Sequence, residues 1–305
     1  MSERGAPPTG PVPIGDTAAP AFARLPDPSR LFAERAERFR ALAPGHGLAP
    51  YLLFLAALSD AQAGLVYDLP RPEWPPADAV ERAYGFSLPP LDRNGFRSDA
   101  ASADALSRLL LRVRAIAMPD LAAQAVARLD AADEAVRAAM ARNVLSDAIP
   151  ADAFAEHALV AAALQVHFAR LAAALVAGRL QPVGDGACPA CGGPPAASLV
   201  VGWSGAHGTR YCACALCGTL WNYVRIKCTL CGGTKGIAYH GIEGDAGTVK
   251  AETCDSCRGY LKILHQHKDP QLDPVADDVA TLGLDLLVRE AGFHRGAVNP
   301  FLLGY

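Results

Sequence analysis

The sequence has no long hydrophobic run, and charged residues make up only 19% of its 305 positions. Its longest unbroken apolar stretch covers residues 48–58, which is too short to cross a bilayer. A longer stretch at 154–180 is interrupted by polar and charged side chains. No apolar segment of the secretory type follows Met1, and two adjacent arginines occur nowhere. We therefore expect a cytoplasmic protein without a transmembrane segment.

The sequence also lacks the short motifs that mark common catalytic sites. It contains no Gly-x-Ser-x-Gly turn, no phosphate-binding loop and no Gly-x-Gly-x-x-Gly fingerprint. His157 and His167 stand ten positions apart in one predicted helix, and we interpret them as buried, hydrogen-bonded side chains. We therefore predict that the chain is not an enzyme.

Cysteine is abundant by contrast, because eight of the nine cysteines form four Cys-x-x-Cys pairs. Twenty-two residues separate the first pair from the second, and 22 separate the third from the fourth. One Cys-x2-Cys-x22-Cys-x2-Cys unit therefore occurs twice, at an offset of 40 positions. The pairs are Cys188 and Cys191, Cys214 and Cys217, Cys228 and Cys231, and Cys254 and Cys257.

Each unit supplies enough sulfur to complete one tetrahedral metal site, with metal–sulfur distances of ~2.3 Å. Gly192 and Gly232 follow the second cysteine of their pairs, where glycine permits the positive φ of a tight turn. A Cys-x-x-Cys disulfide closes too small a loop to stabilise much, and a thioredoxin-type motif needs one pair at a helix start. We predict two bound metal ions, for which four sulfurs suit iron or zinc.

The spacing leaves two questions open. The first pair can share an ion with the second, or with the third in an interleaved scheme. Cys212, the ninth cysteine, stands two positions before Cys214 and is interpreted as a bystander thiol. His265 and His267 alternate as on a strand edge, but four sulfurs already close the second site.

Charge argues against nucleic acid as a partner. The net charge is −3, and residues 188–268 carry eight Lys or Arg against four Asp or Glu, a balance of +4. Two divalent ions with eight thiolates add about −4, which leaves the loaded region close to neutral. A neutral surface is a poor match for a polyanion.

The pattern along the chain predicts an α+β protein with an all-α N-terminal part. Phe32, Ala36, Phe39 and Ala43 share one helical face after a cap at Asp27. Further helices are predicted at 49–66, 102–116, 119–129, 131–144, 152–179 and 275–291, with Pro-rich connectors at 70–76 and 88–91. Short strands are predicted at 197–201 and 236–240.

The predicted domains follow from these patterns. They are a flexible Pro-, Gly- and Ala-rich tail at 1–26, a helical domain at 27–181, metal modules at 182–226 and 227–268, and a C-terminal helix with a docking tail at 269–305. Asp277 and Asp278 form an acidic pair, but adjacent residues point about 100° apart on a helix. On the side chains alone we interpret them as capping or solvated residues.

Seven motifs, within and after the cysteine region, carry a family resemblance. They are CPACG at 188–192, CALC at 214–217, VRIKCTLC at 224–231, KAETCDSCRGYLKIL at 250–264, KDP at 268–270, VADDVA at 275–280 and NPFL at 299–302. With these motifs the chain resembles the FdhE family, the formate dehydrogenase accessory proteins of bacteria. The helical half fits that family in length and character but carries no sharp motif.

The resemblance implies two tandem rubredoxin-like, or zinc-ribbon-like, four-cysteine metal modules between the helical domain and a C-terminal helix, with iron favoured over zinc. It implies a cytoplasmic accessory protein required for assembly or activation of respiratory formate dehydrogenase. That protein would bind the catalytic subunit before twin-arginine export. The resemblance also suggests Asp277 and Asp278 as partner-binding or packing residues.

Two other functions remain open. A rubredoxin-like electron carrier would use iron in four thiolates, which changes charge by one with little geometric change. A zinc-ribbon nucleic-acid binder is the third hypothesis, and the near-neutral loaded region disfavours it.

Overall fold

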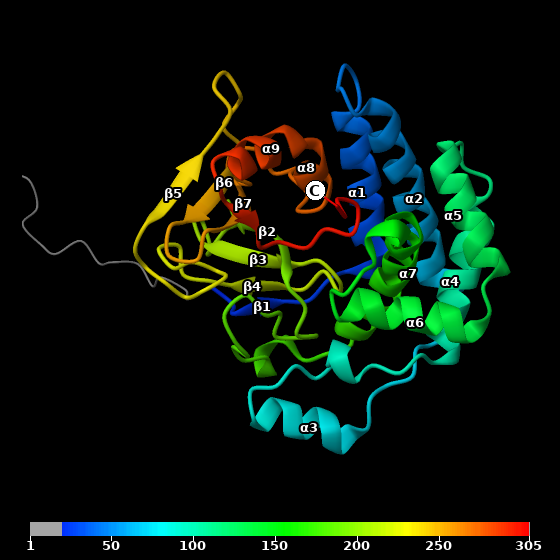
Figure 1. Ribbon diagram of the computed structural model, residues 1–305. Helices are drawn as coiled ribbons and strands as arrows, with labels where there is room; N and C mark the ends of the chain where they lie inside the picture. Colours follow the sequence, from blue (N-terminus) through cyan, green and yellow to red (C-terminus); the bar gives the residue numbers. More distant parts are fainter. Residues whose placement is uncertain (1–19, 305) are drawn as a thin grey trace, which may run out of the picture.

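The computed structural model describes residues 20–304 and confirms the predicted α+β class. A cluster of helices lies beside one eight-stranded sheet, and two further helices, α8 and α9, lie at another side of that sheet (Figure 1). Within the described range the α-helices are α1 (Pro28–Leu42), α2 (Ala49–Asp68), α3 (Ala77–Gly85), α4 (Ala100–Val113), α5 (Asp120–Ala131), α6 (Glu134–Leu145), α7 (Phe154–Ala172), α8 (Ala276–Ala280) and α9 (Leu282–Glu290). The strands are β1 (Ala23–Arg24), β2 (Pro195–Val200), β3 (Arg210–Cys214), β4 (Leu220–Asn222), β5 (Ile237–His240), β6 (Val249–Cys254), β7 (Gly259–Leu264) and β8 (His294–Arg295).

The first helix follows the local signals of the sequence. The Asp27 side chain accepts a hydrogen bond from the Ser29 amide and so satisfies one orphan donor of α1. Pro28 occupies the first turn, where its missing N–H leaves one donor fewer to satisfy. The predicted apolar face is buried, with Phe32, Phe39 and Ala36 fully covered. α1 packs along α2, and together they form one side of the helical part.

α2 is the one helix in residues 20–304 that is long and apolar enough to cross a membrane by length and composition. In the structure it packs against α1, α4 and α7. Its Gln62 amide donates hydrogen bonds to the Ala162 carbonyl and to Gln165, both on α7. These contacts place α2 inside the helical core of this fold.

Each cysteine unit forms a three-stranded antiparallel arrangement, β2–β3–β4 in the first and β5–β6–β7 in the second. The sheet order is β1-β4-β3-β2-β7-β6-β5, with the eighth strand, β8, paired to β7 outside this order. The parallel pair β2–β7 joins the two units. The predicted strands at 197–201 and 236–240 are therefore confirmed as β2 and β5. In this order β1 pairs with the outer side of β4, while β5 forms the opposite edge of the sheet and is largely exposed.

The tail prediction is wrong for its last residues. Residues 1–19 lie outside the described range, but Ala23–Arg24 form β1 and pair with Leu220 and Trp221 of β4. The Tyr211 hydroxyl donates to the Ala21 carbonyl, and the Asn222 amide donates to the Phe22 carbonyl. The Pro-rich composition around this strand predicts a flexible segment. The strand forms because it pairs with β4, almost 200 positions away in the sequence, and no local pattern indicates that partner.

Two predicted helices are shorter than expected, and α3 fills a segment without a sequence prediction. The helix predicted at 152–179 ends at Ala172. The helix predicted at 275–291 is interrupted at Thr281, so that α8 and α9 are separate. The Lys262 ammonium donates to the carbonyls of Asp278 and Thr281, which a continuous helix would use for its own hydrogen bonds.

The main hydrophobic core continues from the helices into the first cysteine unit. One cluster of buried side chains contains Phe32, Leu55 and Phe168 together with Trp221 and all four cysteines of the first unit. A second cluster lies between the sheet and α9 and includes Tyr211, Tyr260 and Leu284. The first cysteine unit therefore shares its packing with the helical part, whereas the second unit packs mainly against α9.

Candidate metal centres

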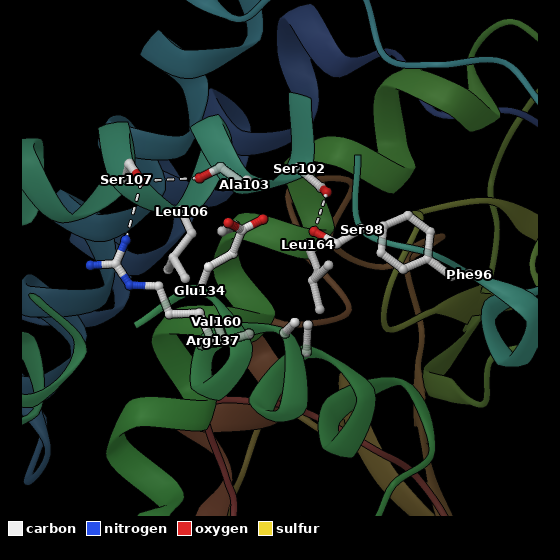
Figure 2. Close-up of a pocket in the computed structure, with 13 residues that line it drawn as sticks. Phe96, Ser98, Ser102, Ala103, Leu106, Ser107, Glu134, Arg137, Val160 and Leu164 are labelled. Carbon is white, nitrogen blue, oxygen red and sulfur yellow. Dashed lines mark hydrogen bonds between the residues drawn. The ribbon is translucent and has the colours of Figure 1, made fainter. Parts of the chain in front are cut away.

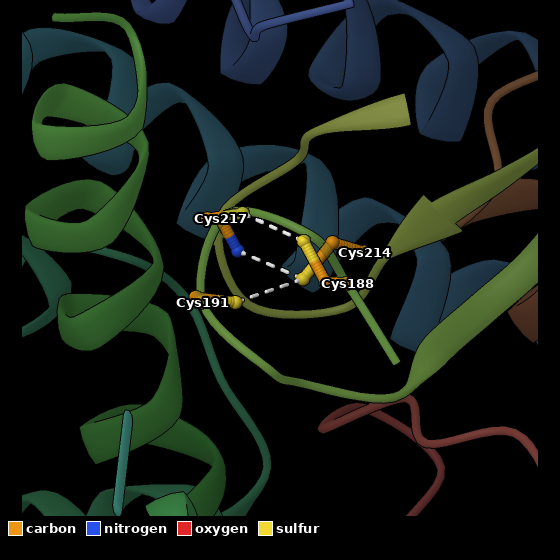
Figure 3. Close-up of side chains that lie close together, drawn as sticks. All are labelled: Cys188, Cys191, Cys214 and Cys217. Carbon is orange, nitrogen blue, oxygen red and sulfur yellow. Dashed lines mark hydrogen bonds between the residues drawn. The ribbon is translucent and has the colours of Figure 1, made fainter. Parts of the chain in front are cut away.

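The structure brings the eight paired cysteines into two quartets, in sequence order rather than interleaved. Cys188, Cys191, Cys214 and Cys217 form the first quartet, and Cys228, Cys231, Cys254 and Cys257 form the second. Within each quartet the sulfur atoms all lie within 4.8 Å of one another (Figure 3 for the first). All nine cysteines are free of disulfides.

The sulfur spacing fits a tetrahedrally bound ion. A tetrahedron with metal–sulfur bonds of ~2.3 Å has sulfur–sulfur edges of about 3.8 Å. The Sγ–Sγ distances are 3.6 Å for Cys188–Cys217 and 3.4 Å for Cys191–Cys214. In the second quartet they are 3.9 Å for Cys228–Cys257 and 3.8 Å for Cys231–Cys254. Both donor sets therefore have the chemistry and the spacing to hold an ion such as zinc or iron.

The turns that present these sulfurs depend on the residue after each pair. Gly192, Gly218 and Gly232 have φ values of 75°, 74° and 70°, in the left-handed region that glycine adopts without a Cβ clash. The fourth turn has Arg258 instead, with φ of 57°. Its guanidinium donates to the carbonyls of Ala291 and Gly292 at the end of α9. Those contacts offset the backbone strain at this turn.

Backbone N–H groups stabilise negative charge on individual sulfurs. The amides of Leu216 and Cys217 both donate to Cys214 Sγ at 3.4 Å, and the Leu230 amide donates to Cys228 Sγ at 3.4 Å. Such charge-assisted bonds favour the thiolate, which is the form that ligates a metal. Cys217 Sγ also lies 3.2 Å from the Thr219 hydroxyl.

In both repeats the first cysteine has a raised pKa and the third cysteine has a lowered one. Burial raises the pKa of Cys214, but hydrogen bonds from Cys188, Cys191 and neighbouring donors outweigh burial and hold it well below its ordinary value. At the equivalent position, burial likewise opposes the backbone N–H bonds that bring the pKa of Cys254 down to about 7. Burial raises the pKa of Cys188 well above its ordinary value. The first cysteine of the second pair is therefore the readiest thiolate in each unit.

The first quartet is enclosed by the helical part. All four cysteines are buried, with at most 4% of any residue exposed. The Leu91 amide donates to the Ala190 carbonyl, and the Arg93 amide donates to the Cys191 carbonyl. From α7, the Gln165 amide donates to the Ala215 carbonyl at 2.7 Å. Both cysteine turns of the first quartet are thus bonded to segments of the helical part.

The second quartet lies at the surface. Cys228 and Cys254 are buried, but Cys257 is half-buried and Cys231 is exposed. Near its first turn, the Lys227 ammonium and the Tyr223 hydroxyl both donate to the Asp185 carboxylate at 2.7 Å. This ion pair is itself partly exposed, with side-chain exposures of 35% and 39% for Lys227 and Asp185.

The remaining residues singled out by the sequence take no part in either quartet. Cys212 is buried on β3 with its Sγ 4.0 Å from the Thr229 hydroxyl, and burial raises its pKa to about 11. The His265 and His267 rings lie 5.4 Å apart, and neither belongs to a metal-ligating group among the described residues. His157 is buried and bonded to the Ala153 carbonyl, in line with the interpretation from the sequence. His167 is also buried, but its Nδ1 lies 3.9 Å from the Asp99 carboxylate and has no hydrogen bond, so the interpretation is wrong for that atom.

Asp277 and Asp278 lie inside the chain, at 3% and 0% exposure, so the interpretation of them as solvated residues is wrong. The Asp277 carboxylate accepts hydrogen bonds from Arg38 on α1, and the Asp278 carboxylate contacts Lys262 and Arg295 near the sheet. Their role in partner binding stays a prediction, and burial argues for packing instead. Nothing in the sequence identified Arg38, Lys262 and Arg295 as their partners.

The helical part contains a pocket between α4, α6 and α7 (Figure 2). Several of its polar side chains already have structural partners. Ser102 forms a capping box with Asp99, the N-cap of α4, in which each side chain accepts a hydrogen bond from the other residue's backbone amide. The Arg137 guanidinium donates to the carbonyls of Leu129 and Asp130. The pocket is lined by Phe96, Ser98, Ser102, Ala103, Leu106, Ser107, Glu134, Arg137, Ala138, Ala141, Val160, Ala163 and Leu164. It presents no nucleophile–base pair of the kind that catalysis requires.

Comparisons with known proteins place this fold and these sites in one family. Family models described as FdhE N-terminal, FdhE central domain and FdhE C-terminal domain match residues 20–185, 187–225 and 226–302. The chain belongs to the FdhE family. A "Protein FdhE homolog" of Rhizobium meliloti is 48% identical over 97% of both chains. Another, from Edwardsiella ictaluri, is 39% identical over 91% of this chain and 90% of the relative.

The structural comparison agrees with the family assignment. The crystal structure of the FdhE protein from Pseudomonas aeruginosa superposes with a TM-score of 0.83 at 33% identity. The match covers 93% of this chain and 99% of that protein. The resemblance inferred from the cysteine motifs is confirmed, and it extends to the helical half, which offered no sharp motif of its own.

Proposed function

We propose that this FdhE-family chain is an accessory protein for the assembly or activation of a respiratory formate dehydrogenase. It binds the catalytic subunit in the cytoplasm before twin-arginine export of that subunit. The observation that carries this proposal is the match to the family models over residues 20–302, which covers the helical part and both cysteine units.

The chemistry of the quartets supports a role without catalysis. Four sulfurs complete a tetrahedral site and leave no open position for a substrate or an activated water. We propose that both quartets hold metal, with iron favoured and zinc as the alternative, and that the ions stabilise the fold or report redox state to the partner. Eight cysteines, gathered in two groups at ligating distance, support two ions per chain.

A genetic test separates this proposal from its alternatives. Deleting the gene in its host should abolish formate-dependent dye reduction by membranes, and a plasmid copy should restore it. Full formate dehydrogenase activity after deletion would contradict the proposal. A Cys212→Ser copy is the matched control, because Cys212 belongs to neither quartet and this variant should restore activity like the wild type.

A binding test examines the partner directly. The purified chain should form a complex with the catalytic subunit that still carries its signal peptide, and size-exclusion chromatography would detect it. The absence of a complex with both proteins folded would contradict binding before export. Elemental analysis and a visible spectrum of the protein purified without oxygen would distinguish two irons from two zincs.

The second candidate function is an electron carrier, and the exposure of Cys231 favours it. A surface-accessible iron tetrathiolate would shorten the path for electron transfer to another protein. A reversible one-electron wave together with reduction of a protein acceptor would support this role. The large helical part has no necessary place in such a carrier, which is why we rank it second.

A further inference from the structure

The two quartets repeat one bonding pattern in two opposite environments. Their sulfur–sulfur distances differ by only a few tenths of an ångström, from 3.4 to 3.9 Å. In the first quartet Cys188, Cys191 and Cys217 have no exposed surface. In the second, Cys231 is exposed and Cys257 is half-buried. The two quartets therefore have similar sulfur spacing, which determines how an ion is bound, but different exposure, which determines whether an external ligand can approach it.

An external ligand cannot approach the first quartet without opening the fold. The four cysteines belong to the same buried cluster as the helical side chains. A Cβ on Gly192 would lie 3.3 Å from the Pro89 ring, and a Cβ on Gly218 would lie 2.8 Å from Leu31, so both turns are covered by the helical part. The hydrogen bond from Gln165 on α7 closes the second turn from the other side. Access therefore requires separation of the helices from the sheet.

The second quartet needs only a local change. Its first turn is covered on one side by Asp185 and Lys227, a partly exposed ion pair of the kind that contributes little to stability. The segment before this turn ends in exposed apolar side chains, with Val224 at 56% and Ile226 at 72% exposure. Cys231 itself is an exposed residue, unlike any cysteine of the first quartet.

We propose that the second quartet is an exchange site, which passes its ion to an external thiol or chelator while the chain stays folded. The first quartet is a permanent structural site that keeps its ion until the chain unfolds. This inference rests on the proposal that both quartets hold metal. In the exchange, incoming ligand atoms replace the cysteine sulfurs one at a time, and each released thiolate takes up a proton given off by an incoming ligand or by water. No electron is transferred.

The physical basis is the difference between local and global opening. Ligand exchange at a closed tetrathiolate requires an incoming donor to contact the ion or to replace a sulfur. At the surface this needs a fluctuation of a single turn, whereas at the first quartet it needs an opening close to global unfolding, which is far rarer. The folded chain would therefore retain the ion of the first quartet and exchange the ion of the second quartet with thiols or chelators in solution.

The test follows metal release from the folded full-length chain loaded with zinc. In excess 4-(2-pyridylazo)resorcinol, a chromogenic zinc chelator, absorbance should rise in two phases of one ion per chain each. The fast phase should exceed the slow one by more than about 100-fold, and the slow phase should match the unfolding rate measured by circular dichroism. A single phase that releases both ions together would overturn the inference.

Variants assign the phases to their quartets. Cys231→Ser should remove the fast phase and leave the slow one, while Cys212→Ser, a buried cysteine outside both quartets, should leave both unchanged. Loss of the slow phase in Cys231→Ser would overturn the assignment.

A second readout uses the wild-type chain alone and so does not depend on a variant that folds. Pulse alkylation with iodoacetamide and peptide mass spectrometry should label Cys231 and Cys257 before any cysteine of the first quartet. Earlier labelling of Cys191 or Cys214 would contradict the inference. If the loaded chain contains only one ion, the two-metal proposal itself fails, which is a result distinct from two ions with equal release rates.

Discussion

The Asp277 carboxylate and the Arg38 guanidinium, 239 positions apart in the sequence, are joined by hydrogen bonds of 2.9 Å from Nε and 2.7 Å from the terminal nitrogen. The next residue, Asp278, faces the other way and contacts Lys262 on β7 at 3.2 Å. Two consecutive carboxylates on α8 therefore connect the C-terminal segment to the helical part and to the sheet. The short helix α8 therefore connects the helical part to the sheet through ion pairs on both sides.

The first prediction concerns these two carboxylates. Asp278→Asn should lower the free energy of unfolding by about 3–5 kcal/mol, because it leaves two buried cations, Lys262 and Arg295, to share the single carboxylate of Asp285. Asp277→Asn should cost less, about 1–3 kcal/mol, since Arg38 also pairs with Asp269. Urea denaturation followed by circular dichroism measures both values. Unchanged stability with lost partner binding would instead assign the pair to docking.

The second prediction concerns the pH dependence contributed by Asp278. Burial raises the pKa of this carboxyl, but the charges of Lys262 and Arg295 outweigh burial and hold the pKa below its ordinary value. A depressed folded-state pKa gives stability that is fully present above the unfolded value, ~3.9, and is lost as the pH falls through the folded value.

The stability difference between the wild type and Asp278→Asn should therefore be constant from pH 7 to about 4 and should shrink below that. Urea midpoints of both chains at matched pH values measure the difference, and effects of acid on the cysteine quartets are shared by both. A difference that grows on acidification would show that the pKa of Asp278 is raised.

The third prediction compares the loss of one pair of ligands from each quartet. Cys188→Ser with Cys191→Ser should remove one ion and lower the melting temperature of the helices too, because the first quartet shares their core. Cys228→Ser with Cys231→Ser should also remove one ion but disturb the helices less. We expect a difference of about 3 kcal/mol, or ~10 °C, in helix melting measured by far-ultraviolet circular dichroism. Equal melting shifts would mean that both quartets support the helices alike.

The fourth prediction tests the strained turn at Arg258. Arg258→Ala keeps the left-handed backbone but loses the hydrogen bonds to the end of α9 and the contact with the Phe293 ring, so it should cost about 1–2 kcal/mol. Arg258→Gly loses the same contacts but relieves the strain, so it should be about 1 kcal/mol more stable than the alanine variant. At an ordinary position glycine is the less stable of the two. Chemical denaturation of both variants decides the sign.

The first helix, the two cysteine quartets and the family could all be predicted from the sequence, because each depends on residues that are close together in the chain. The Asp27 cap and the face of Phe32 and Phe39 predict α1 because their partners lie within the same helix. The 22-residue spacing predicts two quartets because four sulfurs at that spacing can close around one ion. The family motifs identify the chain for the same reason, since four of the seven contain the paired cysteines.

Long-range contacts account for what the sequence left open or misplaced. β1 depends on β4, and the break between α8 and α9 depends on the Lys262 ammonium from β7. The choice between sequential and interleaved pairing of the cysteines was likewise decided by how the strands are ordered in the sheet. None of these partners is near in the chain, so no local pattern could indicate them.

Ligand identity and spacing are local properties, so the cysteine pattern alone specifies two sets of four sulfur ligands. That one set is enclosed and the other exposed follows from packing in the folded chain. Burial depends on what packs around a turn, and here α7 and the loop at 89–93 cover the first quartet while no helix encloses the second in the same way among residues 20–304. Two copies of one cysteine spacing therefore differ in burial because different elements pack around them.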